Sequence, residues 1–141
     1  MNRAIALACV LLLTACSSDS VTVQKAWVRA PLPGRSMTAG YFELHNQTKR
    51  PVIVTGASAD GFGAVSIHET RLDEAGISRM VGVEQLELAP DERVEFAPGG
   101  LHLMLMRPQR EFTKGEIVPV TLLFADGATL HVSATVREDA P

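Results

Sequence analysis

Leu101-His102-Leu103-Met104-Leu105-Met106 alternates without a break between leucine and a side chain with a neutral donor atom. Successive side chains of a β-strand point to opposite faces, so this alternation predicts a strand with a leucine face and a donor face. The leucine face is expected to lie against a core. The opposite face aligns the imidazole of His102 with the thioethers of Met104 and Met106.

Two further residues of the same types precede this strand. Eleven residues separate His68 from Met80, and 21 residues separate Met80 from His102. Taken singly, each has an ordinary explanation, because methionine often fills gaps in cores and histidine is often partly exposed. Two histidines and two methionines in this order instead suggest a soft-metal site, and thioether donors favour Cu(I).

The N-terminus predicts export and lipidation. Arg3 precedes an apolar run over residues 4–13, which is too short for a transmembrane helix of about 20 residues and suits a secretory signal. Leu13-Thr14-Ala15-Cys16 then resembles the bacterial lipoprotein box, in which the chain is cut before a cysteine that carries lipid. A plain signal peptide with an incidental cysteine is the alternative. The lipoprotein interpretation predicts three segments: a signal peptide over residues 1–15, a lipidated tether over 16–20 and a folded domain over 21–138.

Lipidation of Cys16 leaves the mature domain without a thiol, because Cys9 is removed with the signal. A blue-copper site needs a cysteine sulfur, and structural zinc sites usually use cysteine thiolates, so neither is expected. A copper enzyme that cycles to Cu(II) is a rival hypothesis, although Cu(II) prefers nitrogen and oxygen ligands. Since the sequence shows no catalytic triad, phosphate loop or zinc-hydrolase motif, we expect a protein that is not an enzyme.

Length and composition are those of one globular domain. The chain has 141 residues, of which 46% are hydrophobic and 21% charged, as is ordinary for a globular protein. The net charge of −3 and the absence of a basic run do not point to nucleic acid. We therefore expect no nucleic-acid partner, and we expect a monomer.

Short alternating or β-branched runs, bounded by turn residues, predict nine or ten strands and no helix in the mature region. Turn signals about every 8 to 12 residues are typical of an all-β sandwich or barrel. The predicted strands cover residues 21–29, 37–46, 51–57, 64–72, 77–83, 86–88, 93–96, 101–106, 117–124 and 128–136.

The turn over Asp73–Gly76 decides whether His68 and Met80 can meet. If Leu72 pairs with Gly76 around a three-residue loop, His68 stands directly opposite Met80 on one face. A slip by one residue would place the two on opposite faces. The sequence alone leaves this register open.

Three stretches resemble the PCuAC family of periplasmic copper chaperones. They are Ala26–Pro31 with Pro33-Gly34, then Gly40–Asn46, and then a His…Met…His-x-Met segment made of His68-Glu69-Thr70, Arg79-Met80 and Pro98–Met106. The resemblance runs from about Val21 to Val136. The spacing from His68 to Met80 is one residue longer than is usual in the family, and the extra residue falls in or near the Asp73–Gly76 turn.

The resemblance implies a cupredoxin-like Greek-key β-sandwich that holds one Cu(I) per domain. The implied ligands are His68, Met80, His102 and Met104. It further implies a lipid-anchored protein that faces the periplasm of a bacterium and delivers copper by ligand exchange towards the CuA site of cytochrome c oxidase, often with Sco-type proteins.

Other residues receive weaker assignments. Met106 and Met37 are lesser candidates for a metal contact. His45 and His131 are expected to be solvated, and Trp27 is expected in the core. The rival to the copper interpretation is a lipid-anchored structural or assembly protein of the cell envelope whose histidines and methionines are incidental.

Overall fold

The computed structural model describes residues 19–138, and every regular element in this range is a strand. No helix in the described range is long and apolar enough to cross a membrane. The predicted signal peptide and Cys16 lie outside the described residues. The ten strands are β1 (Val21–Arg29), β2 (Met37–Asn46), β3 (Val52–Ala59), β4 (Phe62–Leu72), β5 (Ser78–Gly82), β6 (Leu86–Leu88), β7 (Arg93–Phe96), β8 (Leu101–Pro108), β9 (Ile117–Phe124) and β10 (Thr129–Arg137).

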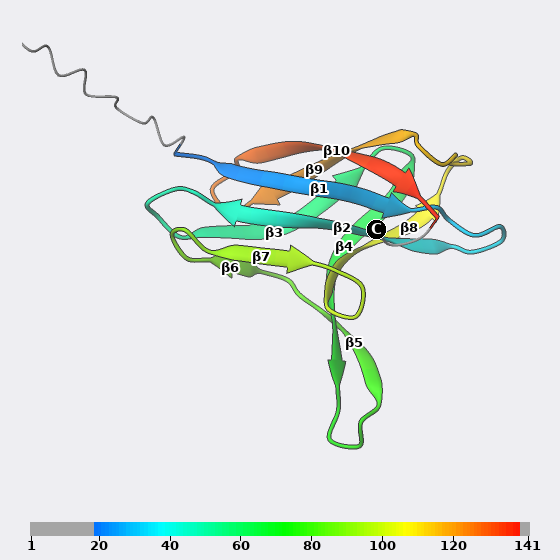
Figure 1. Cartoon of the computed structure of the whole chain (residues 1–141), viewed down its shortest axis with the longest axis horizontal. Coiled ribbons are helices and arrows are strands. Elements are labelled where there is room, and N and C mark those ends of the chain that lie inside the picture. Colours follow the sequence, from blue (N-terminus) through cyan, green and yellow to red (C-terminus); the bar gives the residue numbers. More distant parts are fainter. Residues whose placement is uncertain (1–18, 139–141) are drawn as a thin grey trace, which may run out of the picture.

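The strands form one continuous ladder in the order β5-β4-β8-β7-β2-β1-β10-β9-β3-β6, and β8 also pairs with β2. Strand β1 joins the two halves of this ladder, because it pairs antiparallel with β2 and parallel with β10. Figure 1 shows the ladder folded over on itself as a β-sandwich. The all-β architecture expected from the sequence is thereby confirmed.

The core fills the space between the two halves. Leu103 and Leu105 of β8 are almost completely buried, at 1% and 0% exposed, and they pack in one cluster with Ile67 of β4 and with Val118 and Leu122 of β9. Burying one such side chain contributes roughly 1.5–3 kcal/mol. This packing fixes the leucine face of β8 inward, so the donor face of the same strand must point outward.

The predicted strands agree with the observed ones to within two residues at each end. The register of the β4–β5 hairpin, which the sequence left open, is neither of the two pairings considered for it. Thr70, and not His68, stands opposite Met80, while His68 pairs with Gly82. The N–H of Asp73 donates to the Ile77 carbonyl at 2.9 Å, so the three-residue loop begins one residue later than it would if Leu72 paired with Gly76. The pairing therefore shifts by two residues, and His68 and Met80 stay on the same face as diagonal neighbours.

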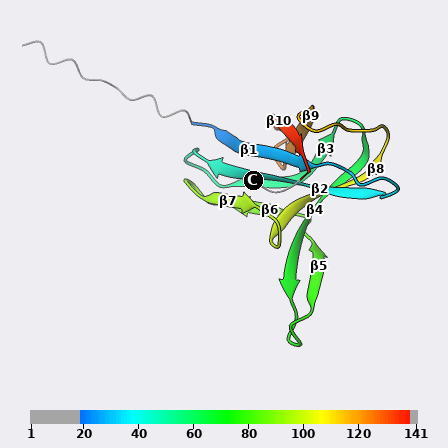
Figure 2. The ribbon, with the colours of Figure 1, turned by 45° about the vertical axis from the view of Figure 1, so that its right-hand side comes forward.

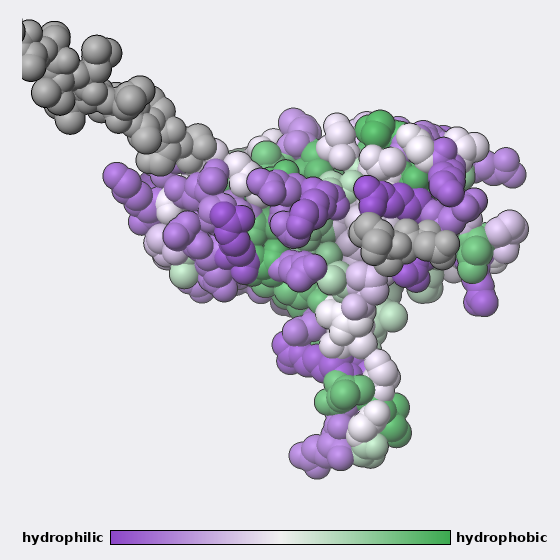
Figure 3. Space-filling model, in the orientation of Figure 1, coloured by the Kyte–Doolittle hydropathy of each residue, from purple (hydrophilic) through white to green (hydrophobic). Residues whose placement is uncertain are grey.

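This β4–β5 hairpin projects from the body of the sandwich, as Figures 1 and 2 show from two directions. All five residues of β5 are exposed, whereas β4 pairs with β8 from Phe62 to Glu69. In Figure 3 the projecting arm carries apolar as well as polar residues, and its exposed apolar side chains include Leu72, Ile77, Met80 and Val81.

Candidate metal centre

The centre of the candidate site is a pair of histidines on neighbouring strands. His68 of β4 lies directly opposite His102 of β8 in the antiparallel ladder. Their ring centroids are 6.0 Å apart and the rings are tilted by 39°. Since a metal–nitrogen bond is roughly 2 Å long, two rings at this separation can both reach one ion between them. The strand register thus brings together two residues that lie 34 positions apart in the sequence.

The main chain holds the His102 ring in one orientation. Its Nδ1 lies 3.0 Å from the Gly100 carbonyl oxygen. A carbonyl can only accept, so Nδ1 carries the proton, and the lone pair is on Nε2. The ring itself is only 6% exposed. A buried imidazole with one nitrogen fixed to a carbonyl is the usual arrangement of a metal-binding histidine.

The Gly100 carbonyl also accepts the N–H of Thr70 on β4, at 3.1 Å. It therefore fixes both the His102 ring and the end of the β4–β8 ladder. Sequence reasoning did not identify this role of Gly100. The signal was the turn Pro98-Gly99-Gly100 directly before the strand, where Gly99 adopts a φ of 84° that favours glycine.

His68 has the opposite character, because no hydrogen bond from the described residues fixes its ring. Its Nδ1 is buried without a hydrogen-bond partner among the described residues. An unpartnered buried polar atom costs about 1–3 kcal/mol, and a metal ion is one group that would satisfy it. Burial lowers the pKa of His68, and the neighbouring His102 lowers it further. His68 is therefore neutral at pH 7, as a metal ligand must be.

Met104 lies on the same face as the two histidines, two residues after His102 on β8. It is half-buried and stands between Ala39 of β2 and Ser66 of β4. Both neighbours are small, so the thioether is not covered from either side strand. The Ser66 hydroxyl is buried without a hydrogen-bond partner among the described residues. The predicted grouping of His68, His102 and Met104 is thus present as three adjacent positions on one sheet face.

Met80 completes this face at the edge strand β5. It pairs with Thr70, two residues from His68, so it is the diagonal neighbour of that histidine. Diagonal cross-strand neighbours remain within reach of long side chains. Met80 is 59% exposed, so its side chain is not fixed by packing. The hairpin places Met80 beside the histidine pair without burying it.

The two lesser candidates lie on the same face at the other end of β8. Met106 is half-buried and pairs with Met37, which is 50% exposed at the start of β2. Four positions separate Met106 from His102 along the strand. The structure therefore places Met37 and Met106 beyond Met104 and away from the histidine pair.

The donor set determines which metals suit this face. In the described chain, no group of three or more His, Cys, Asp or Glu side chains could hold a metal ion. Two imidazoles and two thioethers without a carboxylate or thiolate are a poor set for zinc and for hard cations. Thioether sulfur selects a soft ion such as Cu(I).

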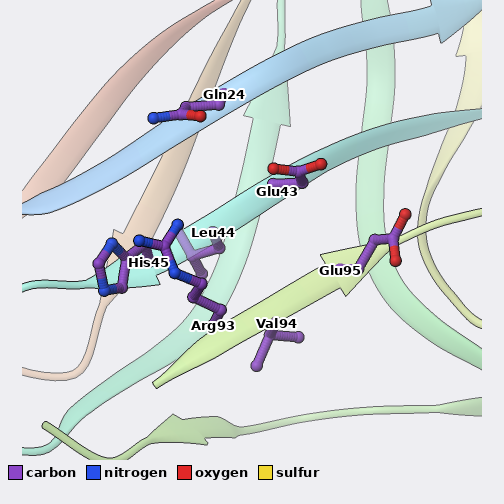
Figure 4. A pocket seen from close by; sticks show the side chains of 7 residues that line it. All are labelled: Gln24, Glu43, Leu44, His45, Arg93, Val94 and Glu95. Atoms are coloured by element: carbon purple, nitrogen blue, oxygen red, sulfur yellow. The ribbon is translucent and has the colours of Figure 1, made fainter. Parts of the chain in front are cut away.

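Another hollow, between β1, β2 and β7, contains none of these residues. Figure 4 shows His45 and Arg93 at one end of it and Glu43 and Glu95 further along. The expectation that His45 is solvated is wrong. Its side chain is buried, at 8% exposed, and its Nε2 lies 2.9 Å from Asp91 Oδ1. His45 lies between Thr22 of β1 and Arg93 of β7, and these neighbours on both side strands account for its burial. The Asp91 carboxylate, from the loop before β7, is itself 91% exposed and adds only the polar contact.

The expectations that His131 is solvated and that Trp27 is buried are confirmed. His131 is exposed on β10, with its Nδ1 3.0 Å from the Thr121 hydroxyl. Trp27 is buried and packs against Tyr41, with ring centroids 4.5 Å apart and the rings tilted by 36°.

Sequence comparisons match the chain to one family model and to bacterial relatives. The family model described as "Putative lipoprotein LpqE-like" matches residues 21–136. "Putative lipoprotein Lxx21020" of Leifsonia xyli subsp. xyli is 31% identical over 121 residues, which are 86% of this chain and 72% of that protein. "Uncharacterized protein RP573" of Rickettsia prowazekii is 30% identical over 107 residues, which are 75% of this chain and 59% of that protein.

Solved structures of PCuAC domains resemble the fold of this chain. The copper-bound PCuAC domain from PmoF2 superimposes with a TM-score of 0.70 at 26% identity, covering 84% of this chain and 93% of that domain. The solution structure of CuI-DR1885 from Deinococcus radiodurans gives a TM-score of 0.66 at 28% identity, with 89% and 83% covered. The expected cupredoxin-like fold is confirmed by these neighbours. The chain belongs to the LpqE-like lipoprotein family, and its β-sandwich is a domain of the PCuAC type.

Proposed function

We propose that the protein is a Cu(I) chaperone that holds one copper ion tightly through His68, Met80, His102 and Met104. The observation that carries the proposal is the cross-strand pair of histidines, with ring centroids 6.0 Å apart and Met104 on the same face. The copper-bound PCuAC structures support this choice of metal. The unpartnered Nδ1 of His68 and the free Nε2 of His102 also support a shared ligand.

Four neutral ligands around Cu⁺ leave a centre of charge +1. Thioethers and unprotonated imidazoles release no proton when the ion binds and take up none when it leaves. An acceptor can therefore replace the ligands one after another. Exchange begins most easily at Met80, because its side chain is exposed and held by no packing. The proposed activity is transfer by ligand exchange, without catalysis.

The proposed place of action is the outer face of a bacterial cytoplasmic membrane or the periplasmic side of an outer membrane. The lipoprotein relatives support export and anchoring through Cys16. We propose the CuA subunit of cytochrome c oxidase as acceptor, with Sco-type proteins as further partners. The soft, exchangeable donor set is compatible with transfer to such thiolate- and imidazole-containing sites.

Anaerobic titration of the purified protein with Cu(I), in competition with a chromogenic chelator, tests the site. The wild type is expected to hold one equivalent tightly, and His68→Ala and Met104→Leu are expected to lose affinity. His131→Ala is the matched control, because His131 is an exposed histidine on β10. Equal affinities for His68→Ala and His131→Ala would refute the copper site and favour a structural role.

Mixing the Cu(I)-loaded protein with an apo CuA domain tests delivery separately. The expected result is that copper appears on the acceptor, as followed by mass spectrometry. Retention of copper by a protein that binds it normally would reject this acceptor while leaving the copper site intact.

A further inference from the structure

The methionines form a continuous row with the histidines. All four methionines in the described range, Met37, Met80, Met104 and Met106, lie on the sheet face that carries His68 and His102. Methionine is usually a core residue, yet two of the four are at least half exposed. Met80 and Met104 flank the histidine pair. Met37 and Met106 form a second pair at the far end of the row.

Met37 and Met106 are directly opposite each other in the β2–β8 ladder. Side chains in such a position have Cβ atoms about 4.5–5.5 Å apart. Methionine has three rotatable bonds beyond its Cα, so both sulfurs can turn towards one ion above the sheet. Met106 is half-buried and Met37 is exposed, so the pair is open to an incoming ligand.

The surroundings of this pair favour a soft ion over other ligands. On β4 the position opposite Met106 is Ala64, and the next positions on this face are Ala39 of β2 and Ser66 of β4. These side chains are short, so the thioethers stand above their neighbours. None of these neighbours carries a carboxylate, which leaves hard cations without the charged oxygen ligands they prefer. Among metal ions, the thioethers of this pair favour a soft ion such as Cu(I).

We propose that Met37 and Met106 form a second, weaker Cu(I) site that exchanges copper with the four-ligand site through Met104. Met104 and Met106 are two residues apart on β8, a separation of about 6.6 Å along a strand. A copper ion on the methionine pair therefore lies one strand step from the tighter site. The identity of the metal rests on the proposed function, but the second site itself depends only on Met37 and Met106.

Binding by two thioethers is weaker than binding by four ligands, so the two sites fill in sequence. The first equivalent of Cu(I) goes to the histidine site. The second goes to the methionine pair, and there it remains accessible because Met37 is exposed. When the tighter site is empty, the exposed pair can receive an incoming ion and pass it to that site, whereas Met80 is the point at which an acceptor begins to remove it.

The test follows the methyl signals of 13C-methyl methionine during anaerobic Cu(I) titration of the purified, detergent-solubilised protein. Each signal is assigned by a single methionine-to-leucine variant, which nearly conserves volume. The first equivalent is expected to shift Met80 and Met104, and the second Met37 and Met106. Met37→Leu/Met106→Leu is expected to lose the second step and keep the first.

The outcomes separate this proposal from the main one. Saturation after one equivalent, with Met37 and Met106 unmoved, overturns the second site only. A second equivalent that persists in Met37→Leu/Met106→Leu also overturns it, since copper then binds elsewhere. Shifts at Met37 and Met106 without any at Met80 and Met104 uphold the second site and overturn the four-ligand site.

Discussion

The two halves of the proposed copper site are held in different ways. The inner half consists of His68, His102 and Met104 on β4 and β8, whose opposite faces are packed into the core. The outer half is Met80 alone, on a projecting hairpin whose β5 strand is exposed throughout. His102 is 6% exposed and Met80 is 59% exposed. The His102 ring is therefore ordered before copper arrives, whereas the Met80 side chain must be ordered by it.

Because the two halves differ in order, we expect them to contribute differently to copper affinity and to copper release. Fixing a methionine side chain opposes binding by roughly 1.5–2 kcal/mol of rotamer entropy, and this loss applies in full to the exposed Met80. The His102 ring is already fixed by its bond to Gly100, so its ligand bond contributes with little such loss. We infer that the inner half provides most of the affinity and that the outer half controls how easily copper leaves.

The largest effect is expected for His102→Ala. Residues that merely support a metal ligand change affinity about 10- to 100-fold, so loss of this ordered ligand should weaken Cu(I) binding by about a hundredfold or more. Chelator competition under anaerobic conditions measures it. Because His102 is buried, His102→Gln accompanies it as a variant that conserves size, and thermal unfolding checks that both variants fold. Near-wild-type affinity in both would show that the inner half is not the anchor.

Met80→Leu should have a smaller effect on affinity and a clear effect on the rate of release. We expect about a tenfold weaker Kd, or 1.4 kcal/mol, together with faster transfer of Cu(I) to a chelator in stopped-flow measurements. Leu72→Ala is the control, because Leu72 is another exposed apolar residue of the same hairpin. If Met80→Leu weakened binding as much as His102→Ala, the two halves would be equivalent and the division would be wrong.

The sequence predicted the inner half better than the outer half, for a physical reason. The alternation of β8 specifies a leucine face that packs in the apolar core, and a one-residue slip would turn His102 and Met104 into that core in place of Leu103 and Leu105. The core therefore fixes the register of β8 strongly. The β4–β5 hairpin has no buried face at β5, so no comparable penalty selects its register, and the sequence left that register open.

The missing information was in the turn chemistry. Gly76 adopts a φ of 77° and occupies the last position of the loop, which is the left-handed position of a three-residue hairpin loop. Asp73 accepts the N–H groups of Ala75 and Ile77, at 3.0 and 2.9 Å, and so defines the start of the loop. A glycine required inside the loop cannot also be the partner of Leu72. The His68–His102 contact depended on long-range pairing, which no local pattern specifies.

Acidification should distinguish the two halves, because only the inner half can be protonated. Burial and the neighbouring His102 lower the pKa of His68 from 6.5, so this histidine stays neutral somewhat below the usual range. We expect Cu(I) affinity to be nearly constant from pH 8 to 7 and to fall by roughly tenfold towards pH 5, as protons compete for imidazole. Titrations at several pH values measure this in wild type and in Met80→Leu. A thioether does not titrate, so the two curves should be parallel; a flat curve would contradict histidine ligation.

The same pKa shift predicts how the metal-free protein responds to acid. The unfolded chain binds a proton at His68 near pH 6.5, whereas the folded chain binds it only at lower pH. The contribution of His68 to the free energy of unfolding is therefore fully present above pH 6.5 and is lost as the pH falls through the lowered pKa. Urea unfolding at pH 7 and pH 5 should show a smaller pH-dependent loss in His68→Ala than in wild type.

The smallest effect is expected for Asp73→Ala, which acts on the outer half at a distance. The Asp73 carboxylate accepts two loop N–H groups and pairs with Arg79 at 2.7 Å, next to Met80. Its removal should loosen the turn and widen the range of positions of Met80, while the core is untouched. We expect an unchanged melting temperature, faster amide exchange confined to β5, and Cu(I) affinity lower by only about twofold, since Met80 provides the smaller share of the affinity. Arg79→Ala, which removes the ion pair but leaves the loop hydrogen bonds, separates the two contributions. A fall in the melting temperature as large as that of a core variant would mean that the hairpin is part of the folded body, and that copper does not need to order it.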